Sequence, residues 1–413
     1  RVAPKFPCWV APPPALGARF KLQLQIQLNR KTTMSTLVSR LDSLSELIRG
    51  ASYLEHTDSG INISRLPAWV HERIEHDPML KMTAGQGSGV RLVFSTLATE
   101  VELGLILTTL QFGEMPAWPI AVDVLVDGEP QRFAVAQASN VINPMIPQLG
   151  RQTNEPTILN FKFVPSESAR EIQIWLPQNC AVTISSFAAN AELYACESKL
   201  PKWVHYGSSI SQCSEADGPL GVWPVVAAQA LNLDVYNLGL GGQAQLDQFA
   251  ARTIVGLEPD LISLKVGINT VNANSLNART FPHAVHGFID TIRDALPETP
   301  ILISTAIHCP PHEDGYAPTV FDPVLRKATA SAKPNELFPQ TLNLAMTREI
   351  VERVVNLRRK DDTNLFLISG LDLFSEADAH DLPDDLHPNA EGYLRMGERF
   401  AAHPTVSEWL GRG

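Results

Sequence analysis

The sequence predicts two domains: an all-β sandwich, followed by an α/β domain with a parallel sheet. Between residues 89 and 189, short runs rich in Val, Ile and Phe alternate with Gly, Pro, Asn and Asp, a rhythm typical of an antiparallel sandwich or jelly roll. Beyond Lys202, strand-like runs are separated by stretches long enough for crossover helices, which indicates parallel strands. The length of 413 residues also exceeds what one hydrophobic core usually supports.

The first 33 residues differ in composition from the rest of the chain. They carry six basic residues and no acidic one, begin without Met, and include the cluster Ala-Pro-Pro-Pro-Ala. No apolar segment followed by a small-residue cleavage site marks a secretory signal. We therefore expect residues 1–33 to be a disordered leader or an extension that precedes a start at Met34.

The first domain, expected at residues 34–198, opens with a helix and continues with strands. Four leucines between positions 37 and 47 recur at helical spacing, so the pattern predicts a short amphipathic helix over residues 34–49. The predicted strands cover residues 89–96, 100–109, 120–128, 131–137, 158–164, 171–177 and 180–189. Trp69, Trp118 and Trp175 could stack on sugar rings or pack in the core, and both interpretations stay open.

The second domain is expected at residues 199–413. Its strand-like runs are residues 203–206, 234–238, 260–266, 300–307 and 364–369. In open parallel sheets the ligand lies beyond the carboxyl ends of the strands, so we expect the chemistry directly after these runs.

The composition argues against two kinds of partner. No apolar run approaches the roughly 18 to 20 residues of a membrane-spanning helix. The formal charge of −11 at pH 7 disfavours binding to the phosphate backbone of nucleic acid. The five cysteines suggest neither a disulfide framework nor a metal-ligand spacing, so we expect free thiols in a reducing compartment and a cytoplasmic protein. The sequence does not indicate the oligomeric state.

Several polar residues at the expected strand ends can perform acyl transfer. The first run ends in Gly207 and the adjacent Ser208 and Ser209, and a C-terminal loop contains Asp384 and His387. A serine hydroxyl is a weak nucleophile until a base removes its proton, and a histidine near its ordinary pKa is suited to that task. A carboxylate three residues before the histidine can reach the ring and fix its tautomer.

The second and third runs supply candidates for binding an oxyanion. Gly242 follows the second run, and Asn269 follows the third. The backbone N–H of Gly242, the backbone N–H of the nucleophile and the side-chain amide of Asn269 could all donate to a tetrahedral intermediate. Each signal is weak alone, but their joint order along the chain predicts a serine nucleophile with a base and an oxyanion hole.

These blocks resemble the SGNH or GDSL hydrolases over residues 203 to about 402. In that resemblance Gly207 stands for the glycine of the G-D-S-L block, Ser208 replaces its aspartate, and Ser209 falls on the nucleophile. In the family the aspartate helps to anchor the turn, so Ser208 leaves a smaller and neutral hydrogen-bonding group. The resemblance implies a flavodoxin-like three-layer fold for this domain.

The remaining blocks of the family fall on the candidates described above. The resemblance implies catalytic Ser209, Asp384 and His387, and an oxyanion hole of Ser209, Gly242 and Asn269. Longer motifs, RLPAWVHER and SGVRLVFST in the first domain and GSSI, DLPDDLHPNAEGY and MGERF in the second, further resemble a subgroup with an N-terminal jelly roll. That subgroup includes polyketide-tailoring acyltransferases and is similar in architecture to carbohydrate esterases.

The expected function is hydrolysis of a carboxylic ester of a small acylated metabolite or sugar, through an acyl-enzyme. Transfer of the acyl group to an alcohol is the first alternative, since it would use the same residues. A catalytically inactive protein that binds a glycan or another ligand is the second. We expect no cofactor and no metal. The acyl chain and the alcohol cannot be deduced from the sequence.

Two other motifs suggest different chemistry. GLGGQA at residues 239–244 satisfies a dinucleotide-binding pattern, but the next run, DLISLKVGIN, lacks an acidic residue at its end for the ribose. HCPPHEDG at residues 308–315 gathers potential metal ligands. We expect Pro310 and Pro311 to prevent a helix there, so that this segment forms a loop over the pocket rather than a metal site.

Overall fold

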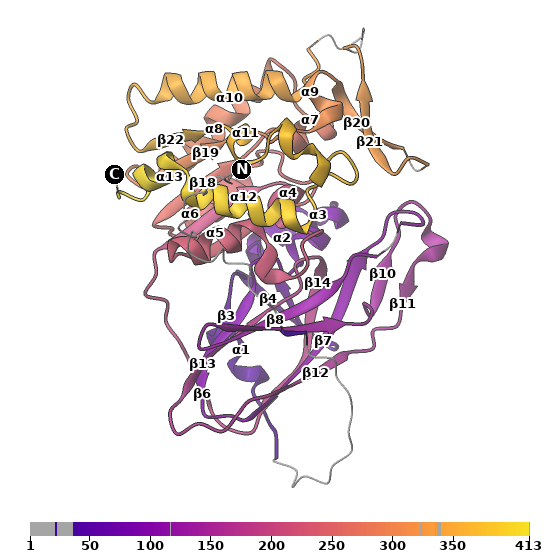
Figure 1. Cartoon of the computed structure of the whole chain (residues 1–413), viewed down its shortest axis with the longest axis vertical. Coiled ribbons are helices and arrows are strands. Elements are labelled where there is room, and N and C mark those ends of the chain that lie inside the picture. The colour runs from indigo at the N-terminus through magenta and orange to yellow at the C-terminus, as the bar shows by residue number, and fades with distance from the viewer. Residues whose placement is uncertain are drawn as a thin grey trace, which may run out of the picture.

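The computed structural model describes residues 21–22, 36–115, 117–322, 324–334, 336 and 340–412. The leader expected at residues 1–33 therefore lies outside the described residues, apart from the short strand β1 (Lys21–Leu22). In Figure 1 the strands of the first half of the chain fill the lower part of the molecule, and the α/β half lies above them. None of the helices in the described part of the chain has the length and apolarity needed to cross a membrane.

The second half is built on a parallel sheet of the order β17-β16-β18-β19-β22. These strands span Asp234–Gly239, Lys202–Gly207, Leu261–Lys265, Ile301–Ser304 and Leu365–Ile368. All four pairings are parallel, and every residue from Trp203 to Gly207 in the interior strand β16 is buried. The predicted parallel sheet is confirmed, and continuous burial explains why its strands are apolar runs rather than alternating ones.

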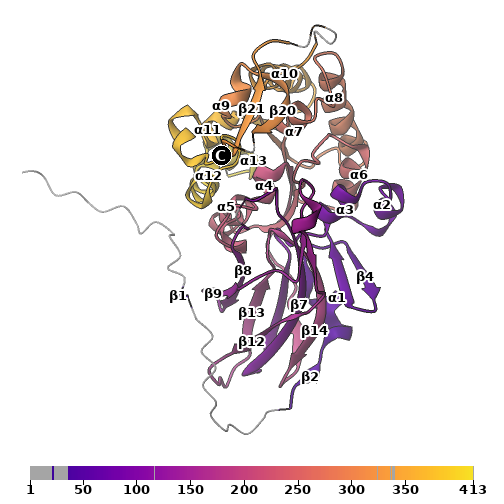
Figure 2. The ribbon, with the colours of Figure 1, turned by 90° about the vertical axis from the view of Figure 1, so that its right-hand side faces the viewer.

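Helices cover both faces of this sheet, as Figure 2 shows. On one side α5 (Trp223–Leu231) packs against α12 (Ala390–Ala402), which continues into α13 (Pro404–Trp409). On the other side α8 (Thr280–Arg293) packs against α6 (Gln248–Gly256) and α10 (Leu344–Arg358). The sheet therefore lies between two layers of helices, which confirms the three-layer arrangement expected for this half of the chain.

The first half contains two facing sheets with an apolar core between them. One sheet has the order β1-β9-β8-β13-β6-β15, and β3 (Ile48–Arg49) also pairs with β6. Its other strands are β6 (Arg91–Thr96), β8 (Ile120–Val126), β9 (Glu129–Val135), β13 (Arg170–Trp175) and β15 (Leu193–Ala195). Each of the predicted strands between residues 89 and 189 overlaps an observed one, whereas the jelly-roll connectivity stays a prediction.

The second of these sheets has the order β11-β10-β7-β14-β5-β4, with β12 on β7 and β2 on β14. Its strands are β2 (Val38–Ser39), β4 (Tyr53–Thr57), β5 (Gly60–Ser64), β7 (Glu100–Leu110), β10 (Asn140–Ile142), β11 (Arg151–Gln152), β12 (Thr157–Lys162) and β14 (Cys180–Ala189). The helices α2 (Ala68–Arg73) and α3 (Pro78–Ala84) come after β5 in the chain. Both lie against the α/β half.

The helix predicted over residues 34–49 is wrong in extent. Only a 3-10 turn at Leu41–Ser43 and the single turn α1 (Leu44–Leu47) are helical. The chain on either side pairs with strands instead, through β2 and β3. Leu44 and Leu47 are buried in the sandwich core, so tertiary pairing outweighs the helical spacing of the leucines.

Candidate active site

The serine block lies at the carboxyl end of β16, which pairs with β17 and β18. Ser208 is the N-cap of the short helix α4 (Ser209–Gln212), and its Oγ accepts a hydrogen bond from Ile210 N at 3.2 Å. The capping role explains how a serine can hold this turn where the family has an aspartate. Gly207 is needed at the strand end because a Cβ there would lie 2.2 Å from Ser211 Oγ.

The first residue of α4, Ser209, forms a continuous hydrogen-bonded chain with the C-terminal loop. Ser209 Oγ lies 2.9 Å from His387 Nε2, and His387 Nδ1 lies 2.7 Å from Asp384 Oδ2. The second oxygen of Asp384 accepts from the backbone N–H groups of Leu386 at 3.0 Å and His387 at 2.6 Å. The carboxylate is therefore fixed on both sides, and it orients the imidazole toward Ser209.

The adjacent carboxylate is not part of this chain. Asp385 has a positive φ of 61°, and its carboxylate pairs with Lys327 Nζ at 3.0 Å. Asp385 is nearer than Asp384 to His387 in the sequence, but the structure turns only Asp384 toward the ring, as predicted.

Burial and charge act in opposite directions on the titration of the loop residues. Burial alone would lower the pKa of His387, but the nearby carboxylates of Glu215 and Asp384 raise that pKa to about 9. Burial also disfavours the charged form of Asp384, yet the charge and hydrogen bonds of His387 hold the pKa of Asp384 below its usual value. The pair is thus stabilised as carboxylate and imidazolium.

The predicted oxyanion donors lie beside the serine. Asn269 belongs to α7 (Ile268–Asn272), and its Oδ1 accepts from Ala244 N at 3.0 Å. That contact fixes the amide, and Asn269 Nδ2 is buried without a hydrogen-bond partner in the described residues. Gly242 has a positive φ of 72° and lines the same cavity as Ser209 and Asn269. A buried donor with no partner is costly unless a ligand supplies the acceptor.

The family model of GDSL-like lipases and acylhydrolases matches residues 205–395. Over this segment, which is less than half of its length, the chain is similar to that family. This match covers Ser209, Gly242, Asn269, Asp384 and His387, the residues whose geometry is described above.

Solved structures also resemble the chain over nearly its whole length. The salicylyl-acyltransferase SsfX3 from a tetracycline biosynthetic pathway is 26% identical, with a TM-score of 0.72 over 91% of this chain and 97% of that chain. A protein described as a GDSL-like lipase from Bacteroides ovatus ATCC 8483 shares the fold at 19% identity, with a TM-score of 0.64, over 91% of this chain and 98% of that chain.

A further structure shares the fold at lower identity. It is an active-site mutant of a family two carbohydrate esterase from Clostridium thermocellum, 15% identical with a TM-score of 0.56, covering 89% of this chain and 99% of that chain. No curated protein sequence gives a significant match. The family match and the likeness to the salicylyl-acyltransferase support a hydrolase or an acyltransferase, and the other two structures show the shared fold.

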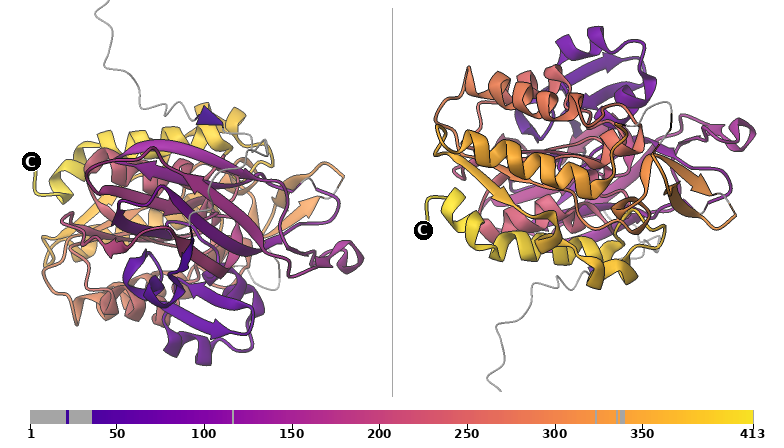
Figure 3. Two further views of the ribbon diagram at one scale, coloured as in Figure 1. Left: turned by 90° about the horizontal axis from the view of Figure 1, so that it is seen from below. Right: turned by 90° about the horizontal axis from the view of Figure 1, so that it is seen from above.

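Ser209 lines a cavity of about 370 Å³. The apolar lining residues are Met79, Leu110, Phe112, Met115, Trp118, Met145, Phe321 and Leu386. Six of these eight belong to the first half of the chain, so the sandwich supplies one wall of the site. Hairpins β10–β11 and β20–β21 (Tyr316–Asp322 and Lys327–Ser331) project on the same side of the molecule in Figures 1 and 3. Met145 and Phe321, which come from these two regions, both line the cavity.

The three tryptophans noted in the sequence have different surroundings. Trp118 is half-buried, lines the cavity and makes an edge-to-face contact with Phe112 at 6.4 Å between ring centroids. Trp175 is buried beneath the guanidinium of Arg91, and Trp69 packs against Arg73. Of the three, only Trp118 lines the cavity.

The sandwich also contacts the backbone that carries the oxyanion donors. Gln86 accepts a hydrogen bond from the side chain of Gln212, whose Oε1 in turn accepts from Gly241 N at 2.8 Å. Arg65 is fully buried and donates to the carbonyls of Asn237 at 2.9 Å and Gly239 at 2.7 Å. The glycine-rich segment after β17 is therefore held by residues from the first half of the chain.

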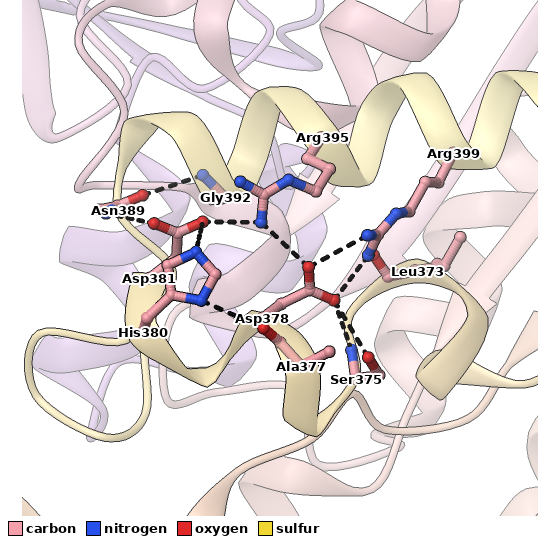
Figure 4. Close-up of polar contacts among 10 residues, drawn as sticks. All are labelled: Leu373, Ser375, Ala377, Asp378, His380, Asp381, Asn389, Gly392, Arg395 and Arg399. Carbon is pink, nitrogen blue, oxygen red and sulfur yellow. Dashed lines mark hydrogen bonds and ion pairs between the residues drawn. The ribbon is translucent and has the colours of Figure 1, made fainter.

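The loop with Asp384 and His387 is anchored by a separate ionic cluster, drawn in Figure 4. Asp378 is bonded to Arg395 at 3.0 Å and to Arg399 at 2.6 Å, both on α12. Asp381 contacts Asn389 at the other end of the loop, where Asn389 Nδ2 donates to Asp381 Oδ1 at 3.0 Å. These contacts fix both ends of segment 381–389, which contains the histidine.

Sequence reasoning missed a second carboxylate beside the histidine. Glu215 Oε1 lies 3.9 Å from His387 Nδ1, and Glu215 also lines the cavity. Its surroundings in the sequence, Ser-Glu-Ala-Asp-Gly, are those of an ordinary polar loop. Its place six residues after the nucleophile was the only available signal.

The segment 308–315 differs from the expected loop. Pro310 and Pro311 begin a one-turn helix, α9 (Pro310–Glu313), because proline is well suited to the first positions of a helix. Its polar side chains are engaged within the protein: Glu313 pairs with Arg348 at 2.6 Å, and His312 Nε2 bonds Thr319 Oγ1 at 2.7 Å. These contacts engage Glu313 and one ring nitrogen of His312 within the protein.

Proposed function

We propose that the protein is a serine acyl-transfer enzyme that hydrolyses a carboxylic ester of a small molecule with an apolar acyl group. The observation that carries this proposal is the hydrogen-bonded chain from Asp384 through His387 to Ser209, opening into a cavity with an apolar wall. An acetyl group would leave most of this wall uncovered, so an acyl group of several carbons or an aromatic one fits the lining better.

The proposed reaction follows from the contacts of Ser209. His387 Nε2 takes the hydroxyl proton while Oγ attacks the ester carbonyl, and Asp384 stabilises the resulting imidazolium. Asn269 Nδ2 and the backbone N–H groups of Ser209 and Gly242 receive the oxyanion. Collapse of the intermediate releases the alcohol, which takes its proton from His387, and leaves an ester on Ser209. A water molecule activated by His387 then hydrolyses that ester.

Acyl transfer to an alcohol is the second candidate. It is favoured by the likeness to the salicylyl-acyltransferase, whose identity to this chain is 26%. An alcohol would replace water in the last step and use the same proton acceptor, so the two functions share every catalytic residue. The two are distinguished by which acceptor the cavity admits.

A panel of p-nitrophenyl esters from acetyl to decanoyl, with benzoyl included, tests the proposal. We expect kcat/KM to rise from acetyl to a longer or aromatic acyl group and activity to disappear in the Ser209→Ala variant. Adding competing alcohols and analysing the products separates hydrolysis from transfer. Absence of turnover throughout, together with no labelling of serine by an organophosphonate, would instead indicate a binding protein without catalysis.

A further inference from the structure

Glu215 presents a second carboxylate to the catalytic histidine. Its side chain is only 14% exposed, and Oε1 lies 3.9 Å from His387 Nδ1. The other oxygen accepts a hydrogen bond from the hydroxyl of Tyr393 at 2.8 Å. Tyr393 lies on α12 and is fully buried, so this contact fixes the carboxylate against the back of the imidazole.

The distance defines what Glu215 can do. At 3.9 Å the contact is too long for a hydrogen bond, and the proton on Nδ1 already faces Asp384 at 2.7 Å. Glu215 is therefore not a substitute for Asp384 in the chain to Ser209. It acts on the ring through charge, and burial of both groups makes that interaction stronger than it would be in water.

We propose that Glu215 is a positioning residue that stabilises the imidazolium form of His387 and thereby sets the pH range in which the enzyme works. This inference rests on the proposed function, because His387 must be neutral to accept the proton of Ser209. The same charge has two effects: it favours the imidazolium that forms during the reaction, and it keeps a larger share of the resting histidine protonated.

The other groups around this pair do not supply the same effect. They are Asp384 in the same loop, Tyr393 on α12, Cys213 after α4, Cys309 after β19, and the ion pair of Asp385 with Lys327 of β21. Burial raises the pKa of both thiols and of Tyr393, so these three groups stay neutral near pH 7. The charge of Asp385 is balanced by Lys327. Glu215 and Asp384 are thus the uncompensated charges that act on His387 among the described residues.

The pKa of His387 fits this arrangement. Burial would lower it, but the carboxylates of Glu215 and Asp384 raise it to about 9. A group whose pKa is raised loses its proton only as the pH passes that value, so activity should rise with pH through about pH 9. Removing the charge of Glu215 should shift the midpoint of this rise in activity to lower pH by about 1–2 units, the usual effect of one opposite charge at this distance.

The test measures the histidine directly and then the reaction. The pKa of His387 is followed by NMR of protein labelled with ¹⁵N in the imidazole rings, and its signal is assigned by its loss in His387→Gln. We expect Glu215→Gln to lower this pKa by about 1–2 units. The matched control is Asp385→Asn, which removes a carboxylate two residues from His387 that is already paired with Lys327, and should shift the pKa by less than about 0.3 unit.

The pH profile of kcat/KM supplies the second readout. In Glu215→Gln its midpoint should move downward with the NMR value, and kcat on the alkaline plateau should fall about tenfold, the equivalent of one pH unit of lost stabilisation. A fall of kcat at every pH without movement of the midpoint would indicate a merely structural role and would overturn the proposal. An unchanged NMR pKa would overturn it as well.

A second variant and the NMR titration decide the question even if Glu215→Gln does not fold or no ester is hydrolysed. If Glu215→Gln does not fold, Glu215→Asp withdraws the charge by one methylene, and the pKa of His387 should fall in the same direction by a smaller amount. No shift in that variant counts against the proposal. If none of the esters is turned over, the proposed function fails while the NMR titration still decides the role of Glu215.

Discussion

Ser209 Oγ and His387 Nε2 lie 2.9 Å apart, although 178 residues separate them in the chain. The serine is held by the N-terminus of α4 at the end of β16, and the histidine by a loop anchored to α12. The positions of α4 and of the anchored loop therefore set this distance.

The orientation of His387 depends on Asp384 and not on Asp385. Replacing Asp384 with Asn keeps its shape but changes its hydrogen-bond polarity, so kcat/KM near pH 7.5 should fall by up to about 10,000-fold. Asp385→Asn should cost little, because that carboxylate pairs with Lys327. Melting temperatures of both variants serve as the control for folding. A larger loss in Asp385→Asn, or no loss in either, would replace the triad with a dyad of Ser209 and His387.

Asn269 should contribute to the transition state rather than to substrate binding. Its Nδ2 is buried without a partner, while its Oδ1 is held by Ala244 N. Asn269→Ala should lower kcat about 100- to 1,000-fold and leave KM nearly unchanged, as expected when one oxyanion donor is lost. Steady-state kinetics on the best ester of the panel measure both constants. A kcat close to that of the wild type would show that Asn269 only supports its loop.

Contacts from the sandwich should be required for catalysis. Gln86→Leu removes the acceptor that orients Gln212, whose carbonyl oxygen holds Gly241 N next to Gly242. We expect kcat to fall about 10- to 100-fold, since small displacements of positioned groups have effects of that size.

The matched control is Ser52→Ala. Ser52 also bonds across the two halves, to the hydroxyl of Tyr236, but it does not line the cavity. Its loss should leave kcat within about twofold of the wild type. Equal losses in the two variants would mean that the interface acts through stability alone.

Asp378 should stabilise the protein only above acidic pH. Burial of this carboxylate opposes ionisation, but Arg399, Ser375 N and Arg395 hold its pKa below the usual value. A depressed pKa means that the stabilisation is present above the unfolded-state value of about 3.9 and is lost as the pH falls toward the folded-state value. Both arginines are partly exposed, with side-chain exposures of 30% and 38%, so we expect Asp378→Asn to cost only about 1–3 kcal/mol at pH 7.

Urea unfolding of Asp378→Asn at pH 7 and at about pH 3 checks this sign. The difference from the wild type should shrink at the lower pH, where Asp378 becomes protonated in the unfolded chain. Asp372→Asn is the control, because Asp372 is 55% exposed and its contact with His403 is 3.4 Å long. A difference that stays constant with pH would contradict the ionic explanation.

The sequence was sufficient for the parts of the site that follow strands. Ser209, Gly242 and Asn269 each come directly after an apolar run, and a parallel sheet brings the carboxyl ends of its strands to one edge. Asp384 and His387 were predicted because their spacing lets a carboxylate reach the ring. Local rules therefore predicted the candidate base and oxyanion donors and limited the nucleophile to Ser208 or Ser209, and the resemblance to the SGNH or GDSL hydrolases favoured Ser209.

Long-range contacts account for what the sequence did not predict. Glu215 approaches His387 only because Tyr393 and the α4 turn position its loop, and nothing in its neighbours marks that approach. Arg65 is buried and donates hydrogen bonds to two carbonyl groups that lie 172 and 174 positions later in the chain. The helix expected over residues 34–49 yields to strand pairing on both sides, a competition that helical spacing cannot reveal.

A second serine lies within hydrogen-bond distance of a histidine, so the identity of the nucleophile must be tested. Ser211 Oγ lies 2.8 Å from His205 Nε2, but both residues are buried, and burial with the nearby Lys265 lowers the pKa of His205 to about 3. Ser208 Oγ is occupied as the cap of α4. Of these serines, Ser209 alone lines the cavity.

The central claim is that Ser209 is the nucleophile, and mapping the covalent adduct of an organophosphonate by peptide mass spectrometry tests it most directly. We predict a single adduct on Ser209, with no labelling in Ser209→Ala and a loss in kcat of about four orders of magnitude in that variant. Ser208→Ala should keep both the adduct and most of the activity. An adduct on Ser208 or Ser211, or an unlabelled folded wild-type protein, would contradict the claim.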